Sequence, residues 1–446
     1  MQKLFLITLF ALLAISTAGQ ARVAPLNISE RTLENGLQVY SVRDTSNPVV
    51  TVQVWYRVGG KDDPAGRSGF AHMFEHMMFK ATKNMENETL DRLTEDVGGW
   101  NNASTRDDLT NYYEVVPSNY LETLLWAESD RMVNLSVDEK AFASERDVVK
   151  EEYRQGVLAN PYGMLFQYID SLSYKVHPYK RGVIGNLEEL SAASLEDAYK
   201  FYKEYYRPDN ASLIVVGDFE QEQLDKWVDK YFGRLEKPTG EITRVTDKEP
   251  DRTAVERFSK TRPNVPLPAL AMTYFAPPSN SDDISAIKVA EAIMSDGRSS
   301  RLYQELLQKQ QLAQTAVLYS DIRTDKGLLV FYAIAAGGKK LEDIENALLA
   351  EIRKMQDGGP TVKELQKAKN KLVTEILQRR ETANGKAFAI GEAIIYNKDA
   401  RAVNSDVSKL QSVTAEQVKD VMSKYFKENS RAVIYYQKGD DTGGKE

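Results

Sequence analysis

The stretch AHMFEHMMF, residues 71–79, contains two of the three histidines in this chain of 446 residues. His72 and His76 are four positions apart, and Glu75 lies between them. On a helix, residues i and i+4 lie on one face about a turn apart, so both imidazoles can reach a single ion. Glu75 leans to the same side, where it could act as a general base on a metal-bound water. The spacing therefore predicts a catalytic metal site.

The alternative is a buried histidine pair on an amphipathic helix. Met73, Phe74 and Met77 are core-type residues and would form the buried face of that helix. A core helix rarely places two histidines and a carboxylate on one face without a use for them, because buried polar groups are costly. We therefore favour the metal site.

A catalytic zinc needs three protein ligands and one open position. The chain has no cysteine, and we expect the third histidine, His177, to lie in a surface turn. The third ligand should therefore be a carboxylate, and the predicted helix around residues 144–155 contains Glu145, Glu151 and Glu152. Glu145 and Glu152 are two turns apart and share a face, whereas Glu151 points elsewhere. A solvated acidic face is the alternative interpretation of this run.

Strands and long helices alternate around these residues, which indicates an α+β fold with helices packed on mixed sheets. The expected strands cover residues 36–44, 49–60, 108–116 and 211–219, and the expected helices cover residues 68–79, 119–134 and 138–155.

The chain also looks duplicated. Residues 187–219 and 407–440 share one plan: a capped amphipathic helix, a pair of aromatic residues, a polar turn, and a strand that ends in Gly-Asp. Residues 235–262 are polar and poor in aromatics, so we interpret them as a linker between two homologous domains at 22–234 and 263–446. The second domain has no histidine, so histidine-dependent chemistry belongs to the first.

The N-terminus predicts export. Residues 1–21 combine a positive start, an apolar run over residues 4–15 and small residues suited to cleavage, as in a signal peptide. The run is shorter than the roughly 20 residues that span a bilayer, and no other segment is apolar enough, so we expect no stable membrane insertion. A net charge of −7 argues against general nucleic-acid binding. We expect a periplasmic protein.

Two segments together, GFAHMFEHMMFKAT and ERDVVKEEYR, resemble the pitrilysin-type (M16) metallopeptidases, and in particular the mitochondrial processing peptidase and its bacterial relatives. The resemblance implies one zinc per chain, held by His72, His76 and Glu152, and it implies a supporting role for Glu145. It also implies that Asn102 and Ala103 lie on an edge strand that pairs with the substrate backbone.

The second domain departs from the family pattern. It reads SSRLYQELLQKQQLAQ, with Leu307 and Gln314 where active-site arginine and tyrosine stand in some members. The resemblance implies a half-clamshell that closes around a chamber with a second subunit. We therefore expect a homodimer, or a heterodimer with a zinc-less homologous chain.

The sequence thus predicts an exported zinc endopeptidase that acts on unfolded or short peptides, with Glu75 as the general base. The alternatives are a non-catalytic, structural or chaperone-like subunit, and a subunit that is active only with a zinc-less partner.

Overall fold

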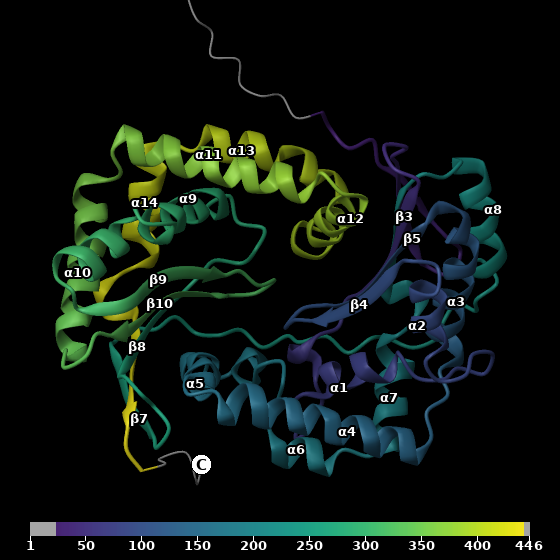
Figure 1. Cartoon of the computed structure of the whole chain (residues 1–446), viewed down its shortest axis with the longest axis horizontal. Coiled ribbons are helices and arrows are strands. Elements are labelled where there is room, and N and C mark those ends of the chain that lie inside the picture. Colours follow the sequence, from purple (N-terminus) through teal and green to yellow (C-terminus); the bar gives the residue numbers. More distant parts are fainter. Residues whose placement is uncertain (1–23, 441–446) are drawn as a thin grey trace, which may run out of the picture.

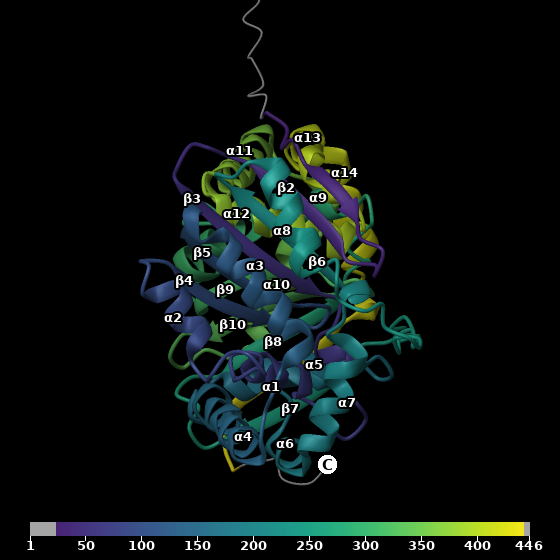
Figure 2. The same cartoon turned by 90° about the vertical axis from the view of Figure 1, so that its right-hand side faces the viewer.

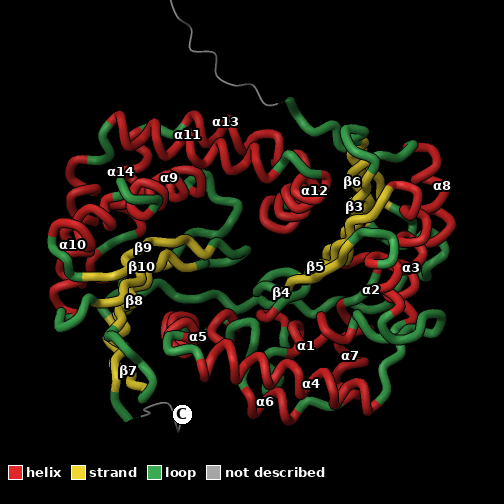
Figure 3. Tube along the Cα trace, viewed as in Figure 1, coloured by secondary structure: helices red, strands yellow, loops and turns green. Residues whose placement is uncertain are grey.

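The computed structural model describes residues 24–440, which fold around two separate β-sheets (Figures 1 and 3). The first sheet has six strands in the order β1-β2-β6-β3-β5-β4, and the second has five in the order β7-β11-β8-β10-β9. The predicted α+β class and half-clamshell are confirmed. The predicted signal peptide lies outside the described residues.

The elements of the first half are β1 (Ser29–Thr32), β2 (Gln38–Arg43), β3 (Val49–Tyr56), α1 (Phe70–Met77), α2 (Thr89–Glu95), β4 (Trp100–Thr105), β5 (Thr110–Pro117), α3 (Leu121–Asn134), α4 (Glu139–Tyr153), α5 (Gly163–Ser173), α6 (Leu187–Ala192), α7 (Leu195–Tyr205), β6 (Ala211–Gly217) and α8 (Gln221–Tyr231). Those of the second half are β7 (Glu256–Arg262), β8 (Ala269–Phe275), α9 (Ile284–Ser295), β9 (Ala313–Asp321), β10 (Leu328–Ala335), α10 (Leu341–Gly358), α11 (Val362–Arg379), α12 (Ala383–Glu392), α13 (Asp406–Ser412), α14 (Ala415–Tyr425) and β11 (Ala432–Lys438).

The two sheets repeat one topology. Strands β2-β6-β3-β5-β4 of the first sheet correspond in order to β7-β11-β8-β10-β9 of the second. In each sheet one pair is parallel, β2 with β6 and β7 with β11, and the remaining pairs are antiparallel. The helix that precedes the parallel partner begins with a capping box in both halves, at Ser194 and at Thr414. The structure thus has the duplicated plan that the sequence suggests.

In each half, one helix packs against the sheet of the other half. Helices α3 and α8 cover one face of the first sheet (Figure 2), whereas α12 from the second half packs on the other face. Helix α5 from the first half likewise packs on β8 and β11 of the second sheet. Strand β6 is buried along its whole length, as expected of a strand covered on both faces.

One segment of the predicted linker is a strand. Glu256–Arg262 form β7, which pairs in parallel with β11 along all seven residues. We therefore propose that the connection between the halves covers residues 235–255. No helix in the described part of the chain is long and apolar enough to cross a membrane.

Candidate metal centre

Helix α1 carries the His-x-x-Glu-His motif. Its first turn is held by the buried carboxylate of Asp63, which accepts hydrogen bonds from the backbone N–H of Gly69 at 2.7 Å and of Ala71 at 2.8 Å. The apolar side of the helix packs into the first core through Phe70, Met73, Phe74 and Met77. His72, Glu75 and His76 therefore lie on the opposite side, half-buried.

Helix α4 lies against α1 and supplies the carboxylates. It begins at Asp138, whose side chain caps the N–H of Ala141, and it buries Phe142 and Val149. This orientation turns Glu145 and Glu152, two turns apart, toward the histidines.

The three predicted ligands converge. Glu152 Oε2 lies 3.6 Å from His72 Nε2 and 3.5 Å from His76 Nε2. Two ligands on a tetrahedral zinc, each bonded at ~2.1 Å, are ~3.4 Å apart, so these separations suit that ion. Among the described residues, His72, His76 and Glu152 form the one group of potential ligands whose donor atoms all lie within 4.8 Å of one another.

The two histidines of the cluster differ in their pKa shifts. Burial lowers the pKa of His72 to about 4, with the neighbouring His76 as a smaller cause, so its imidazole is neutral at pH 7. Burial also opposes the charge on His76, but the hydrogen bond with Glu145 and the nearby carboxylates outweigh it and raise its pKa. Nδ1 of His72 is buried without a hydrogen-bond partner. The nearby carboxylates thus give the cluster the negative surroundings that a cation would satisfy, at the Nε2 side of both rings.

Glu145 supports the cluster from behind. Its Oε2 lies 3.5 Å from His76 Nδ1, and its Oε1 lies 2.7 Å from Lys80 Nζ. A carboxylate on the distal nitrogen of a ligating histidine fixes the tautomer and the ring orientation. Glu151 is exposed and pairs with Arg154 instead, which excludes it from the cluster.

Glu75 lies between the ligands and strand β4. It accepts a hydrogen bond from the Thr105 hydroxyl at the end of β4, and burial raises its pKa. A carboxylate beside a cation site is suited to act as a general base on a bound water.

Strand β4 forms the free edge of the first sheet, since it pairs only with β5. Asn102 is exposed and Ala103 is nearly buried, and the Ala103 N–H donates to the side-chain oxygen of Asn102 at 2.8 Å. That N–H therefore points away from β5 and toward the free edge. A peptide carbonyl could replace the Asn102 oxygen there.

Some features were not expected. The prediction for His177 is wrong: it precedes a short turn but is buried, with only 1% of its surface exposed, and its Nδ1 accepts from the Tyr179 N–H. Asp63 and Lys80 were missed. Lys80 could have been predicted, because it stands four residues after His76 and so on the same face of a helix. Nothing in the local sequence pattern marks Asp63.

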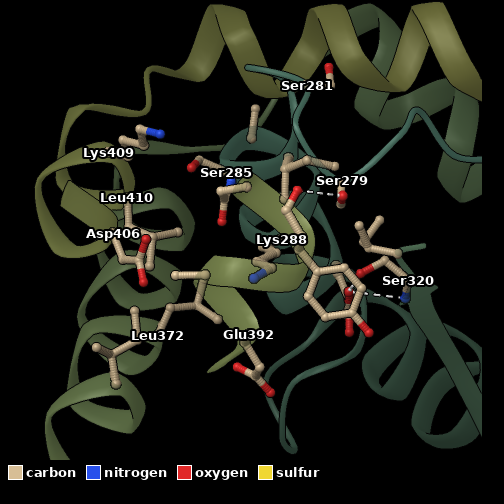
Figure 4. Close-up of a pocket in the computed structure, with 18 of the residues that line it drawn as sticks. Ser279, Ser281, Ser285, Lys288, Ser320, Leu372, Glu392, Asp406, Lys409 and Leu410 are labelled. Carbon is tan, nitrogen blue, oxygen red and sulfur yellow. Dashed lines mark hydrogen bonds between the residues drawn. The ribbon is translucent and has the colours of Figure 1, made fainter. Parts of the chain in front are cut away.

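A cavity of about 750 Å³ lies against α9 and α11 of the second half, and residues 106–108 of the first half also line it (Figure 4). On α9, Lys288, Glu291 and Ala292 repeat the spacing of His72, Glu75 and His76. Glu291 accepts hydrogen bonds from Ser320 on β9, as Glu75 does from Thr105 on β4.

Helix α11 completes the correspondence. Glu375 stands 14 residues after the capping residue Thr361, just as Glu152 stands 14 residues after the capping residue Asp138. Instead of a metal group, Glu375 has the ammonium of Lys371 at 3.1 Å, and Lys371 also contacts Asp296 at 2.6 Å. The second half thus keeps carboxylates at the positions of Glu75 and Glu152, has Ala368 at the position of Glu145, and lacks the histidines.

The two sheets are similar, but only the first half carries a histidine-histidine-glutamate cluster, on α1 and α4. These features define a two-domain protein in which one half is a candidate metal-binding half. Residues 38–186 match the family described as Insulinase (Peptidase family M16), and residues 192–372 match the Peptidase M16 inactive domain. The chain belongs to the M16 peptidase family.

Individual relatives agree with this assignment. The zinc protease PqqE of Helicobacter pylori is 29% identical over 406 residues, which cover 91% of each chain. A probable mitochondrial-processing peptidase subunit beta of Arabidopsis thaliana is 23% identical, over 90% of this chain and 77% of its own. The crystal structure of a protease from Helicobacter pylori superposes with a TM-score of 0.89 at 28% identity, covering 93% of this chain and all of the other.

Proposed function

We propose that this protein is a zinc-dependent endopeptidase that hydrolyses peptide bonds in unfolded or short peptides. The observation that carries the proposal is the convergence of His72, His76 and Glu152 beside Glu75 and the free edge of β4. Zinc bound there would supply Lewis-acid chemistry, which polarises a water molecule and the substrate carbonyl.

The protein side chains would share the remaining work. His72, His76 and Glu152 hold the ion, and Glu145 fixes the ring of His76. Glu75 takes a proton from the attacking water and passes it to the leaving amine. The backbone of β4 at Asn102 and Ala103 would align the peptide as an added strand.

Substituting Glu75 with glutamine tests the role of the base. We expect Glu75→Gln to keep its zinc and to lose about 10²- to 10⁴-fold in kcat, which is the usual contribution of a general base. The measurement pairs zinc analysis with chelator-sensitive cleavage of an unfolded fluorogenic peptide. Full activity in this variant would overturn the assignment.

The third ligand is tested by two neighbouring substitutions. Glu152→Gln should release zinc on dialysis, whereas Glu151→Gln should retain it, because Glu151 faces solvent and Arg154. Equal zinc contents in the two variants would contradict the role of Glu152.

The main alternative to an endopeptidase that acts alone is a subunit that is active only with a zinc-less partner chain. Leu307 packs half-buried against the second core and Gln314 is exposed on β9, so neither position offers an arginine or tyrosine to the substrate. A zinc-less homologous partner could supply these groups, and one relative is itself named as a subunit. Native mass and activity of the pure chain discriminate: a fully active homodimer removes the need for such a partner. If the pure chain contains no zinc and cleaves no peptide, the result would instead favour the alternative of a non-catalytic, structural or chaperone-like subunit.

We also propose a periplasmic location, supported by the apolar run over residues 4–15. N-terminal sequencing of protein recovered from a periplasmic fraction tests this, and should begin after Ala18 or Ala21.

A further inference from the structure

An unusually exposed tryptophan begins the edge strand β4. Trp100 keeps 44% of its surface exposed, although large aromatic side chains are normally well buried. It is the last member of an aromatic row that we define as Trp55, Phe388, Tyr113 and Trp100. Successive ring centroids in this row are 5.6, 4.8 and 5.8 Å apart, and every pair is edge-to-face.

The row extends from the interior to the surface. Trp55 on β3 is buried, Phe388 comes from α12 of the second half, and Tyr113 lies on β5 beside the edge strand. Edge-to-face packing fixes the ring of Tyr113 on both sides, so Trp100 rests on a rigid support. The second half therefore contributes directly to the surface next to β4.

Strand geometry places Trp100 relative to the candidate site. Side chains alternate along β4, so Trp100 and Asn102 point to one face of the sheet, and Ala103 and Thr105 point to the other. Thr105 contacts Glu75 on that second face. At ~3.4 Å per residue, Trp100 lies ~17 Å along the strand from Thr105, which corresponds to about five residues of an added peptide strand.

We infer that Trp100 is a specificity-determining residue that favours substrates with an aromatic or long aliphatic side chain about five residues from the cleaved bond. A peptide strand paired with β4 places alternate side chains on the face of Trp100, where cross-strand neighbours are in contact. An apolar side chain there covers the exposed indole and removes its surface from water. This inference rests on the proposed function, because it requires that β4 binds the substrate backbone.

The test uses peptide pairs that differ only by phenylalanine or serine at one position, scanned along both sides of the scissile bond. Binding to the zinc-loaded Glu75→Gln chain is measured first, so that the result does not depend on turnover. We expect phenylalanine to tighten binding roughly 2- to 10-fold at a position about five residues from the bond, as aromatic cross-strand pairs do.

Trp100→Ala, made in the same Glu75→Gln background, should bring this ratio to about one without changing zinc content or affinity for the serine peptide. Phe166→Ala is the matched control, because Phe166 is equally exposed, at 43%, but lies on α5. It should retain the full ratio. In the chain with Glu75 intact, kcat/KM should show the same preference.

Two outcomes would overturn the inference: a phenylalanine-to-serine ratio that survives in Trp100→Ala, or an altered native mass in Trp100→Ala, which would make Trp100 a subunit contact. Failure of the proposed function looks different. In that case no peptide is cleaved with Glu75 intact, and the binding ratios still decide the role of Trp100.

Discussion

At the scale of single residues, the candidate site depends on which carboxylate faces which histidine nitrogen. Glu152 lies near the Nε2 atoms of both histidines, whereas Glu145 lies at Nδ1 of His76 and is neutralised by Lys80. Burial opposes the charge on Glu145, but its hydrogen bonds with His76 and Lys80 lower its pKa, so it is ionised at neutral pH. An ionised carboxylate at Nδ1 makes the imidazole a better metal ligand.

Glu145→Gln should therefore weaken zinc affinity about 10- to 100-fold without removing the site, since all three direct ligands remain. Competition with a chromogenic chelator gives the affinity of each variant. Asp147→Asn is a suitable control, because Asp147 is on the same helix and its side chain is exposed. An unchanged zinc affinity in Glu145→Gln would show that Glu145 only neutralises Lys80.

The sequence could predict much of this site, because its spacing is local. His72, Glu75 and His76 fall within five residues of one helix, and Glu145 and Glu152 share a face of another. Geometry could not separate Glu152 from Glu145 as the ligand, and the family resemblance was needed for that choice. Asp63 escaped prediction because its partners, the N–H groups of Gly69 and Ala71, are backbone atoms whose placement depends on a loop.

At the scale of elements, helix α12 connects the halves. Gly391 on α12 lies so close to β3 that a Cβ there would be 2.2 Å from Cε2 of Trp55. Gln53 on β3 also donates to the side chain of Asn384 near the start of α12, at 2.8 Å. These contacts join residues more than 300 positions apart, so no local pattern could predict them. Strand β7 was missed for a similar reason: its residues are mostly charged or polar, and they are ordered by pairing with β11 rather than by burial.

Gly391→Ala should lower stability, because the added methyl group must displace Trp55 or the helix. Overpacking of this kind costs ~1–3 kcal/mol, more than the ~1 kcal/mol that alanine gains over glycine in a helix. The midpoint of urea unfolding measures the effect. Gly358→Ala at the end of α10 is the control, since nothing lies within 4 Å of its added Cβ, and its midpoint should stay unchanged or rise. Equal midpoints for both variants would refute the close packing of α12 on β3.

At the scale of the whole molecule, duplication left two versions of one site. The first has histidines and a carboxylate around a candidate zinc position, and the second has Lys371 beside the equivalent carboxylate, Glu375. A positively charged side chain there satisfies the acidic groups that an ion would otherwise satisfy. The same arrangement accounts for the expectation of one zinc per chain.

If this correspondence is correct, a second zinc site can be restored in the second half. Lys288→His and Ala292→His would recreate the histidine spacing on α9, and Lys371→Ala would free Glu375 to become the third ligand. The cavity of about 750 Å³ leaves room for both imidazoles. We expect the triple variant to hold two zinc ions per chain after dialysis, against one in the unmodified protein, with peptide cleavage at the first site retained. Adding Glu375→Gln should return the content to one zinc, because the site would lose the ligand that corresponds to Glu152 and a catalytic-type zinc site needs three protein ligands. A triple variant that still holds one zinc would show that the second half no longer has the geometry of the first.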